Sequence, residues 1–91
     1  MTPASSLLHP ASNPAVYVAS VLTLYVELPD TPMRASTQDQ RHAHSWFVRA
    51  VPLPLVESAL LLASLRRMTR PPDVPPLPRI RSLAYFQPVV E

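Results

Sequence analysis

Arginine is the residue type in this sequence with the most evident binding chemistry. The 91-residue chain contains eight arginines and no lysine. Five arginines fall within sixteen residues, opposed there only by Asp73: Arg66, Arg67, Arg70, Arg79 and Arg81. The guanidinium group is always charged, and its planar fork of donors fits phosphate and carboxylate groups. This local excess of charge indicates a partner rich in such anions, and DNA is the one we expect.

The spacing of these arginines predicts a basic groove. The first three are expected to end one helix and the last two to open the next, with a stiff proline-rich spacer over residues 71–78 between them. Each phosphate neutralised in such a groove adds salt-dependent affinity. Tyr85 lies nearby and offers a ring on which an unpaired base could stack. The alternative is that the arginines only cap helix carbonyls and keep an apolar chain soluble.

Other side chains with reactive groups are poorly placed for catalysis or metal binding. His42 and His44 form a His-x-His pair. Residues two apart on a helix point to different sides, so we interpret both as surface histidines. Ser58 and Ser64 lie within a predicted helix, with no strained elbow and no neighbouring His-Asp pair. We therefore expect no enzymatic activity, no metal, no cofactor and no small-molecule substrate.

The composition excludes several classes of protein. Average usage of roughly 7% would give about six glycines, yet the chain has none. P-loops and Rossmann turns are therefore excluded. Without cysteine there is no disulfide and no thiolate metal site. The longest apolar stretch, over residues 15–28, is too short and too interrupted to span a membrane, which takes roughly 20 apolar residues. With no targeting signal evident, we expect a cytosolic location and no membrane association.

Proline marks the expected helix boundaries. The 13 prolines recur where helices could begin, because the missing N–H of proline is harmless in the first helical turn. The pattern predicts a disordered N-terminal arm over residues 1–13 and a single helical domain over 14–91. Its helices are expected at about 14–28, 36–50, 54–68 and 78–90. The expected fold class is all-α, a small orthogonal bundle of about four short helices.

Capping signals refine these boundaries. Asn13 is the expected N-cap of the first helix. The second helix begins either at Pro32 or after Ser36, which has Asp39 three residues later as in a capping box. Pro88 is expected to kink or end the last helix. The short last helix leaves two alternatives open, a complete chain and a fragment of a longer protein.

Apolar residues with helical spacing identify the expected core. The stripes are Ala43, Trp46, Phe47 and Ala50 in the second helix, Val56, Ala59, Leu60 and Ala63 in the third, and Ile80, Leu83 and Ala84 in the last. Glu57 and Ser64 are expected on the opposite side of the third helix. Of Tyr85 and Phe86, only one can point fully inward.

The run IRSLAYFQPV over residues 80–89 resembles the C-terminal helical motif of DnaD-like replication-initiation proteins. In that family an Ile-x-Ser-x-x-Tyr run leads into Tyr-x-x-x-Ile-x-x-x-Trp, and Tyr85 and Val89 match the first two positions of the second part. The preceding helix, which contains the run Val-Glu-Ser-Ala-Leu over residues 56–60, is similar to the helix before that motif, with an arginine-rich connector between the two. The resemblance covers roughly the second half of the chain. It implies a helical module of a replication protein that binds DNA and partner proteins.

The expected function is that of a non-enzymatic DNA-binding module of a replication-initiation or plasmid/phage-maintenance protein. Phosphates would be contacted by the five clustered arginines, with Tyr85 nearby. Other replication proteins or a second copy of the chain are further expected partners. The alternative is a helical module for protein–protein interaction or oligomerisation, without a nucleic-acid role, in which the apolar excess marks a docking surface.

Overall fold

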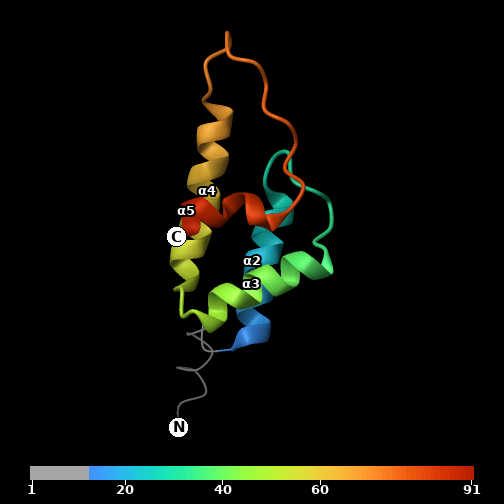
Figure 1. The fold of residues 1–91 in the computed structure, drawn as a ribbon, viewed down its shortest axis with the longest axis vertical. Coiled ribbons are helices and arrows are strands. Elements are labelled where there is room, and N and C mark those ends of the chain that lie inside the picture. Colours follow the sequence, from blue (N-terminus) through green and yellow to red (C-terminus); the bar gives the residue numbers. More distant parts are fainter. Residues whose placement is uncertain (1–12) are drawn as a thin grey trace.

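The computed structural model describes residues 13–91, which form a small bundle of helices (Figure 1). Its elements are α2 (Pro14–Glu27), α3 (Thr37–Val48), α4 (Leu53–Met68), the 3-10 helix η2 (Leu83–Phe86) and α5 (Gln87–Val90). No strand occurs within this described part. α3 crosses α2 at a steep angle, and α5 lies across α4 (Figure 1). The predicted all-α bundle is confirmed, whereas the predicted N-terminal arm, apart from Asn13, lies outside the described residues.

α2 begins where the sequence indicates. The Asn13 side chain accepts hydrogen bonds from the N–H groups of Ala15 and Val16, at 2.9 and 3.3 Å. These bonds satisfy two of the donors that are left free at a helix start. The helix buries one stripe, spaced four residues apart and formed by Tyr17, Val21 and Tyr25.

α3 starts after Ser36, which confirms the second of the two predicted starts. The Ser36 hydroxyl accepts a hydrogen bond from the N–H of Asp39 at 3.0 Å, and the Asp39 carboxylate accepts one from the N–H of Ser36 at 2.9 Å. Asp39 is buried, and its second oxygen accepts a hydrogen bond from the N–H of Leu83 at 2.9 Å. One carboxylate therefore fixes both the start of α3 and the start of η2.

α3 ends in a left-handed turn at Ala50, which the sequence had placed in the core stripe. Ala43 and Trp46 are buried as predicted, and Phe47 packs against the core. Ala50 is exposed instead, with φ of 61°. The N–H groups of Val51 and Ala50 donate to the carbonyls of Trp46 and Phe47, both at 3.0 Å, as in a Schellman motif. This turn moves Ala50 off the stripe, so its predicted burial was wrong.

Replacing Ala50 with glycine is expected to stabilise the fold by roughly 0.5–1 kcal/mol, since glycine adopts left-handed φ values at no steric cost. Part of the gain is lost to the greater freedom of glycine in the unfolded chain. Urea unfolding followed by circular dichroism measures the change. The matched control is Ala19→Gly, at an exposed position inside α2, where the same substitution should destabilise by about 0.5–1 kcal/mol. Similar destabilisation at both positions would contradict this account of the turn.

α4 begins one residue before its predicted start. Its predicted inner face is confirmed, since the buried residues include Val56, Ala59, Leu60 and Ala63. Ser64 was expected on the opposite side but is buried as well. It follows Leu60 by four residues and therefore lies on the same side of the helix. Glu57, also expected on the exposed side, is half-buried.

The helix predicted over residues 78–90 is shorter than expected. The chain has no helical structure over residues 78–82, and η2 then leads directly into α5. Two hydrogen bonds to distant segments hold this path: the N–H of Ile80 donates to the carbonyl of Asp30 at 2.8 Å, and the N–H of Leu83 donates to Asp39. Tertiary contacts therefore replace the first turns of the predicted helix.

Pro88 and Ala84 also differ from expectation. Pro88 stands in the first turn of α5, where its missing N–H is harmless, so it starts a helix rather than ending one. Ala84 is exposed, because the three-residue turn of η2 places Phe86 above Leu83 instead. Phe86 is fully buried and is thus the inward member of the Tyr85–Phe86 pair.

Side chains from α2, α3, α4 and η2 meet in one core. The largest fully buried ones include Trp46, Tyr17, Tyr25, Phe86, Leu60 and Leu83. Burial raises the pKa of Tyr17 and of Tyr25 to about 12, so both hydroxyls are neutral at physiological pH. The Tyr17 hydroxyl donates to the carbonyl of Val51 at 2.7 Å. This core fixes the relative position of α4, whose last turn carries Arg66 and Arg67, and η2, which the chain reaches after Arg70, Arg79 and Arg81.

Candidate nucleic-acid interface

The proline-rich segment turns back along the helix that precedes it. In Figure 1 it rises from the end of α4 and then returns toward η2. Two arginines hold it in place: Arg70 donates to the carbonyl of Pro75, and Arg67 donates to the carbonyl of Pro78, both at 2.9 Å. Because Arg79 directly follows Pro78, the bond from Arg67 brings the start of the second group of arginines near the end of α4.

Arg67 is a clamp between distant segments rather than an exposed cation. Its side chain is only 9% exposed. One guanidinium nitrogen donates to the Tyr85 hydroxyl at 3.1 Å, and the other lies 3.3 Å from a carboxylate oxygen of Asp30. The guanidinium carbon is 5.3 Å from the centre of the Tyr85 ring, within the range of a cation–π contact. The hydrogen bond to Tyr85, together with Asp30, raises the pKa of Arg67.

Tyr85 is the partner side chain in this clamp. It is 44% exposed, and its ring stands edge-on to Phe86, with the ring centres 5.2 Å apart. Since the Arg67 guanidinium lies over the ring, a base could stack only on the part of the ring that stays exposed. Two of the six predicted site residues, Arg67 and Tyr85, are therefore occupied with each other.

The other four predicted arginines stay exposed on the surface. We call this group the basic end: Arg66, Arg70, Arg79 and Arg81. Side chains alternate between the two sides of an extended segment. Ile80 is buried, so the two arginines that flank it point outward together.

The basic end has no carboxylate partner in the described part of the chain. The ion pairs within residues 13–91 are Arg49 with Glu91 and Arg67 with Asp30. Asp73 is the only acidic residue between positions 58 and 90 of the sequence. Asp30 is distant in sequence but lies beside Arg67 in the structure. Five of the eight arginines thus gather beside two carboxylates, which leaves an excess of positive charge.

A cleft of about 250 Å³ lies between α4 and the proline-rich segment. Asp30, Ser64, Arg67 and Arg70 supply its polar lining, and Leu77 is among its apolar residues. Both arginines already donate to backbone carbonyls of the segment. Ligand pockets usually measure about 300–1,000 Å³, so we interpret this cleft as the space beneath the segment rather than as a ligand site.

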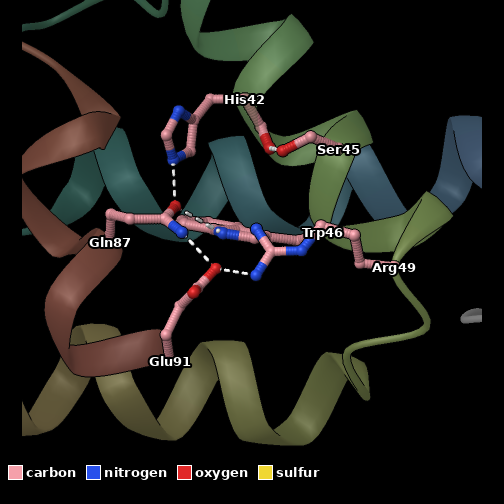
Figure 2. Close-up of polar contacts among 6 residues, drawn as sticks. All are labelled: His42, Ser45, Trp46, Arg49, Gln87 and Glu91. Carbon is pink, nitrogen blue, oxygen red and sulfur yellow. Dashed lines mark hydrogen bonds and ion pairs between the residues drawn. The ribbon is translucent and has the colours of Figure 1, made fainter.

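A second polar cluster fastens α5 to α3 (Figure 2). Gln87 lies at its centre: its carbonyl oxygen is 2.5 Å from Nε2 of His42 and accepts the indole N–H of Trp46 at 2.9 Å. The Gln87 amide donates to Glu91, which also pairs with Arg49. The cluster satisfies the polar atom of the buried Trp46 and anchors the last helix.

This cluster corrects the interpretation of His42 as a surface histidine. His42 is half-buried, and its ring meets that of Trp46 edge-on, with the ring centres 4.8 Å apart. His44 is exposed, as predicted. Among residues 13–91, no group of three or more His, Cys, Asp or Glu side chains is placed to hold a metal ion. The sequence carried no signal for this cluster, because His42 and Trp46 meet a partner more than forty residues away.

The chain matches no protein-family model, no curated protein and no solved structure. The resemblance of residues 80–89 to the DnaD-like motif therefore stays a prediction. In the structure this run is an extended segment followed by η2 and most of α5, rather than one continuous helix. No helix of the described part is both long and apolar enough to cross a membrane.

Proposed function

We propose that the chain is a non-enzymatic DNA-binding module that contacts phosphates through the basic end. The observation that carries this proposal is the group of four exposed arginines without a carboxylate partner in the described chain. Arginine suits this role because its fork of donors matches two phosphate oxygens at once. Arg67 would have a supporting role: its hydrogen bonds to the Tyr85 hydroxyl and the Pro78 carbonyl keep the proline-rich segment against α4.

Binding of this kind depends on charge more than on base sequence. Phosphate contacts fix the position of a protein on DNA but carry no sequence information. Each phosphate that an arginine neutralises releases counterions, so the affinity falls steeply as salt is added. The exposed part of the Tyr85 ring would add stacking on an unpaired base, and a preference for single strands would show this contribution.

A role in replication or in plasmid/phage maintenance is part of the same proposal. It is supported by the resemblance of residues 80–89 to the DnaD-like motif. A cytosolic location would agree with such a role. Partner proteins of the replication machinery would then meet surfaces other than the basic end.

The double variant Arg79→Gln with Arg81→Gln is expected to weaken DNA binding and to flatten its salt dependence. Both side chains point outward, and neither makes a hydrogen bond or ion pair within residues 13–91. Each lost phosphate contact should reduce the slope of log affinity against log salt by about 1, so the double variant should lose about 2. Fluorescence anisotropy with labelled single- and double-stranded oligonucleotides over a series of salt concentrations measures this slope.

The matched control is the double variant Arg34→Gln with Arg41→Gln. It removes the same charge from two exposed arginines outside the basic end. We expect this control to keep the wild-type salt slope. Equal losses in the two double variants would show that only net charge matters, which would contradict a role for the basic end in particular. A folded wild-type chain that binds no DNA would refute the proposed function itself.

A further inference from the structure

The outer face of α4 exposes a stripe of large apolar side chains. With Ser58, which lies on the same face, they form the outer stripe: Leu55, Leu61, Leu62, Leu65 and Met68. The exposed fraction of the five apolar residues ranges from 43% to 68%. The opposite face of α4 packs against α2, η2 and α5. A surface helix normally carries polar residues on the side away from its core, so this stripe calls for a partner.

The outer stripe has the spacing of a helix–helix interface. Leu55, Ser58, Leu62 and Leu65 follow one another at intervals of three, four and three residues. Leu61 and Met68 lie beside them on the same face. Alternating intervals of three and four keep a row of side chains facing a neighbouring helix. From Leu55 to Met68, the outer stripe extends over about 20 Å of helix.

The outer stripe is complementary to a second copy of itself that runs in the opposite direction. When a two-fold axis passes between positions 61 and 62, Leu61 of one copy meets Leu62 of the other. Leu55 then meets Met68. Ser58, the one small residue of the stripe, meets the large Leu65, so that the two surfaces interdigitate. Each residue of the stripe has a counterpart in this arrangement, as an isologous two-fold interface requires.

Charge favours this direction over a parallel pair. A parallel pair would bring the two basic ends side by side, where their like charges repel. In the antiparallel pair, the arginines at the end of each α4 are level with the part of the other α4 that carries Glu57. Opposite ends of the two helix dipoles also lie together. The outer stripe itself contains no charged residue that the pairing would bury.

We propose that the chain forms a symmetric antiparallel dimer through the outer stripe of α4. A stable interface usually buries roughly 800 Å² of each partner, whereas the largest apolar patch on a monomer measures roughly 300–600 Å². One helix stripe about 20 Å long belongs to the smaller class. The dimer should therefore be weak and form at micromolar concentrations. This inference does not rest on DNA binding, because the basic end and the outer stripe are different surfaces.

Sedimentation equilibrium of the full chain over a concentration series tests the dimer. We expect a monomer–dimer equilibrium with a dissociation constant on the order of 1–100 μM. Leu62→Glu places two carboxylates beside the two-fold axis and should raise this constant at least about tenfold, with an unchanged circular dichroism spectrum. The matched control is Val48→Glu, at an exposed position of α3, which should leave the constant unchanged. A wild-type chain that is monomeric at every concentration, with its outer stripe left for some other partner, would overturn the proposal.

Cross-linking tests the direction of the pair. The chain contains no cysteine, so an introduced thiol has no competitor. A mixture of two chains, one with Ser58→Cys and one with Leu65→Cys, should form disulfide-linked dimers under mild oxidation. Each variant alone should not form them. In a dimer of one variant, the Cα atoms of the two introduced cysteines, one in each copy, are offset by about 10 Å along the helix axis, whereas a disulfide joins Cα atoms no more than roughly 7 Å apart. Efficient cross-linking of either variant alone would indicate a parallel pair and overturn the antiparallel arrangement.

Discussion

Replacing Arg67 with methionine is expected to lower the free energy of unfolding by about 2–3 kcal/mol, since hydrogen bonds from a charged group contribute about 1.5–3 kcal/mol. Methionine keeps much of the apolar stem but loses the bonds to the Pro78 carbonyl and the Tyr85 hydroxyl. The ion pair adds little, because Asp30 is more than half exposed and water screens it. Urea unfolding monitored by circular dichroism gives the change in stability.

Two neighbouring substitutions separate this clamp from a general effect of charge. Arg66→Met removes the same charge from an exposed position one residue earlier, and its effect should stay within about 0.5 kcal/mol. Arg67→Lys keeps the charge but lacks the planar fork, so it should fall between Arg67→Met and the wild type. If Arg67→Met and Arg66→Met were equally mild, the clamp would not hold the proline-rich segment in place.

Replacing Asp39 with alanine is expected to cost about 2–3 kcal/mol, because the buried N–H of Leu83 is left without its partner, which costs about 1–3 kcal/mol, and the capping bond to the exposed Ser36 is lost as well. The carboxylate accepts the N–H of Ser36 through one oxygen and the N–H of Leu83 through the other. Its loss frees the start of α3 and the start of η2 together. Chemical denaturation measures the stability, and amide exchange at Leu83 reports the second bond directly.

Asparagine at the same position separates the two bonds. Asp39→Asn retains one acceptor oxygen, so it should cost roughly half as much as Asp39→Ala. Glu57→Ala is the matched control, since Glu57 is a half-buried acid on α4 for which no hydrogen bond or ion pair is present in the described chain. Its effect should stay within about 0.5 kcal/mol. An equally small effect of Asp39→Ala would contradict a shared anchor for α3 and η2.

Elements that depend on local signals were predictable from the sequence. The Asn13 cap, the Ser36–Asp39 capping box and the inner face of α4 each follow from residues within one or two helical turns of one another. Ala50 shows the limit of such signals, because a chain without glycine gives no sign of where a left-handed turn will end a helix.

Contacts between distant segments were not predictable in this way. The path of residues 78–82 is fixed by the carbonyl of Asp30 and by Asp39, which precede this segment by some forty residues or more. The arginine cluster was evident from composition and spacing. The burial of Arg67 against Asp30 and Tyr85 was not, because it arises only when the proline-rich segment folds back on α4.

The outer stripe of α4 marks a third limit. α4 is apolar on most of its circumference, and a single sequence does not say which side faces the core when both sides are apolar. The inner face through Val56 and Leu60 was predicted correctly from its helical spacing. Ser64 was nevertheless predicted on the wrong side, and the same spacing does not predict that the leucines on the opposite face are exposed.

The salt dependence of DNA binding by the intact chain tests the central claim most directly. Four phosphate contacts predict a slope of log affinity against log salt of about −3 to −4 on duplex DNA, so the affinity should fall roughly a hundredfold between about 50 and 200 mM salt. Anisotropy titrations of the folded chain against a labelled duplex at these two salt concentrations would suffice. A fall of that size supports phosphate contacts by the basic end, whereas no binding, or binding that salt leaves unchanged, would contradict them.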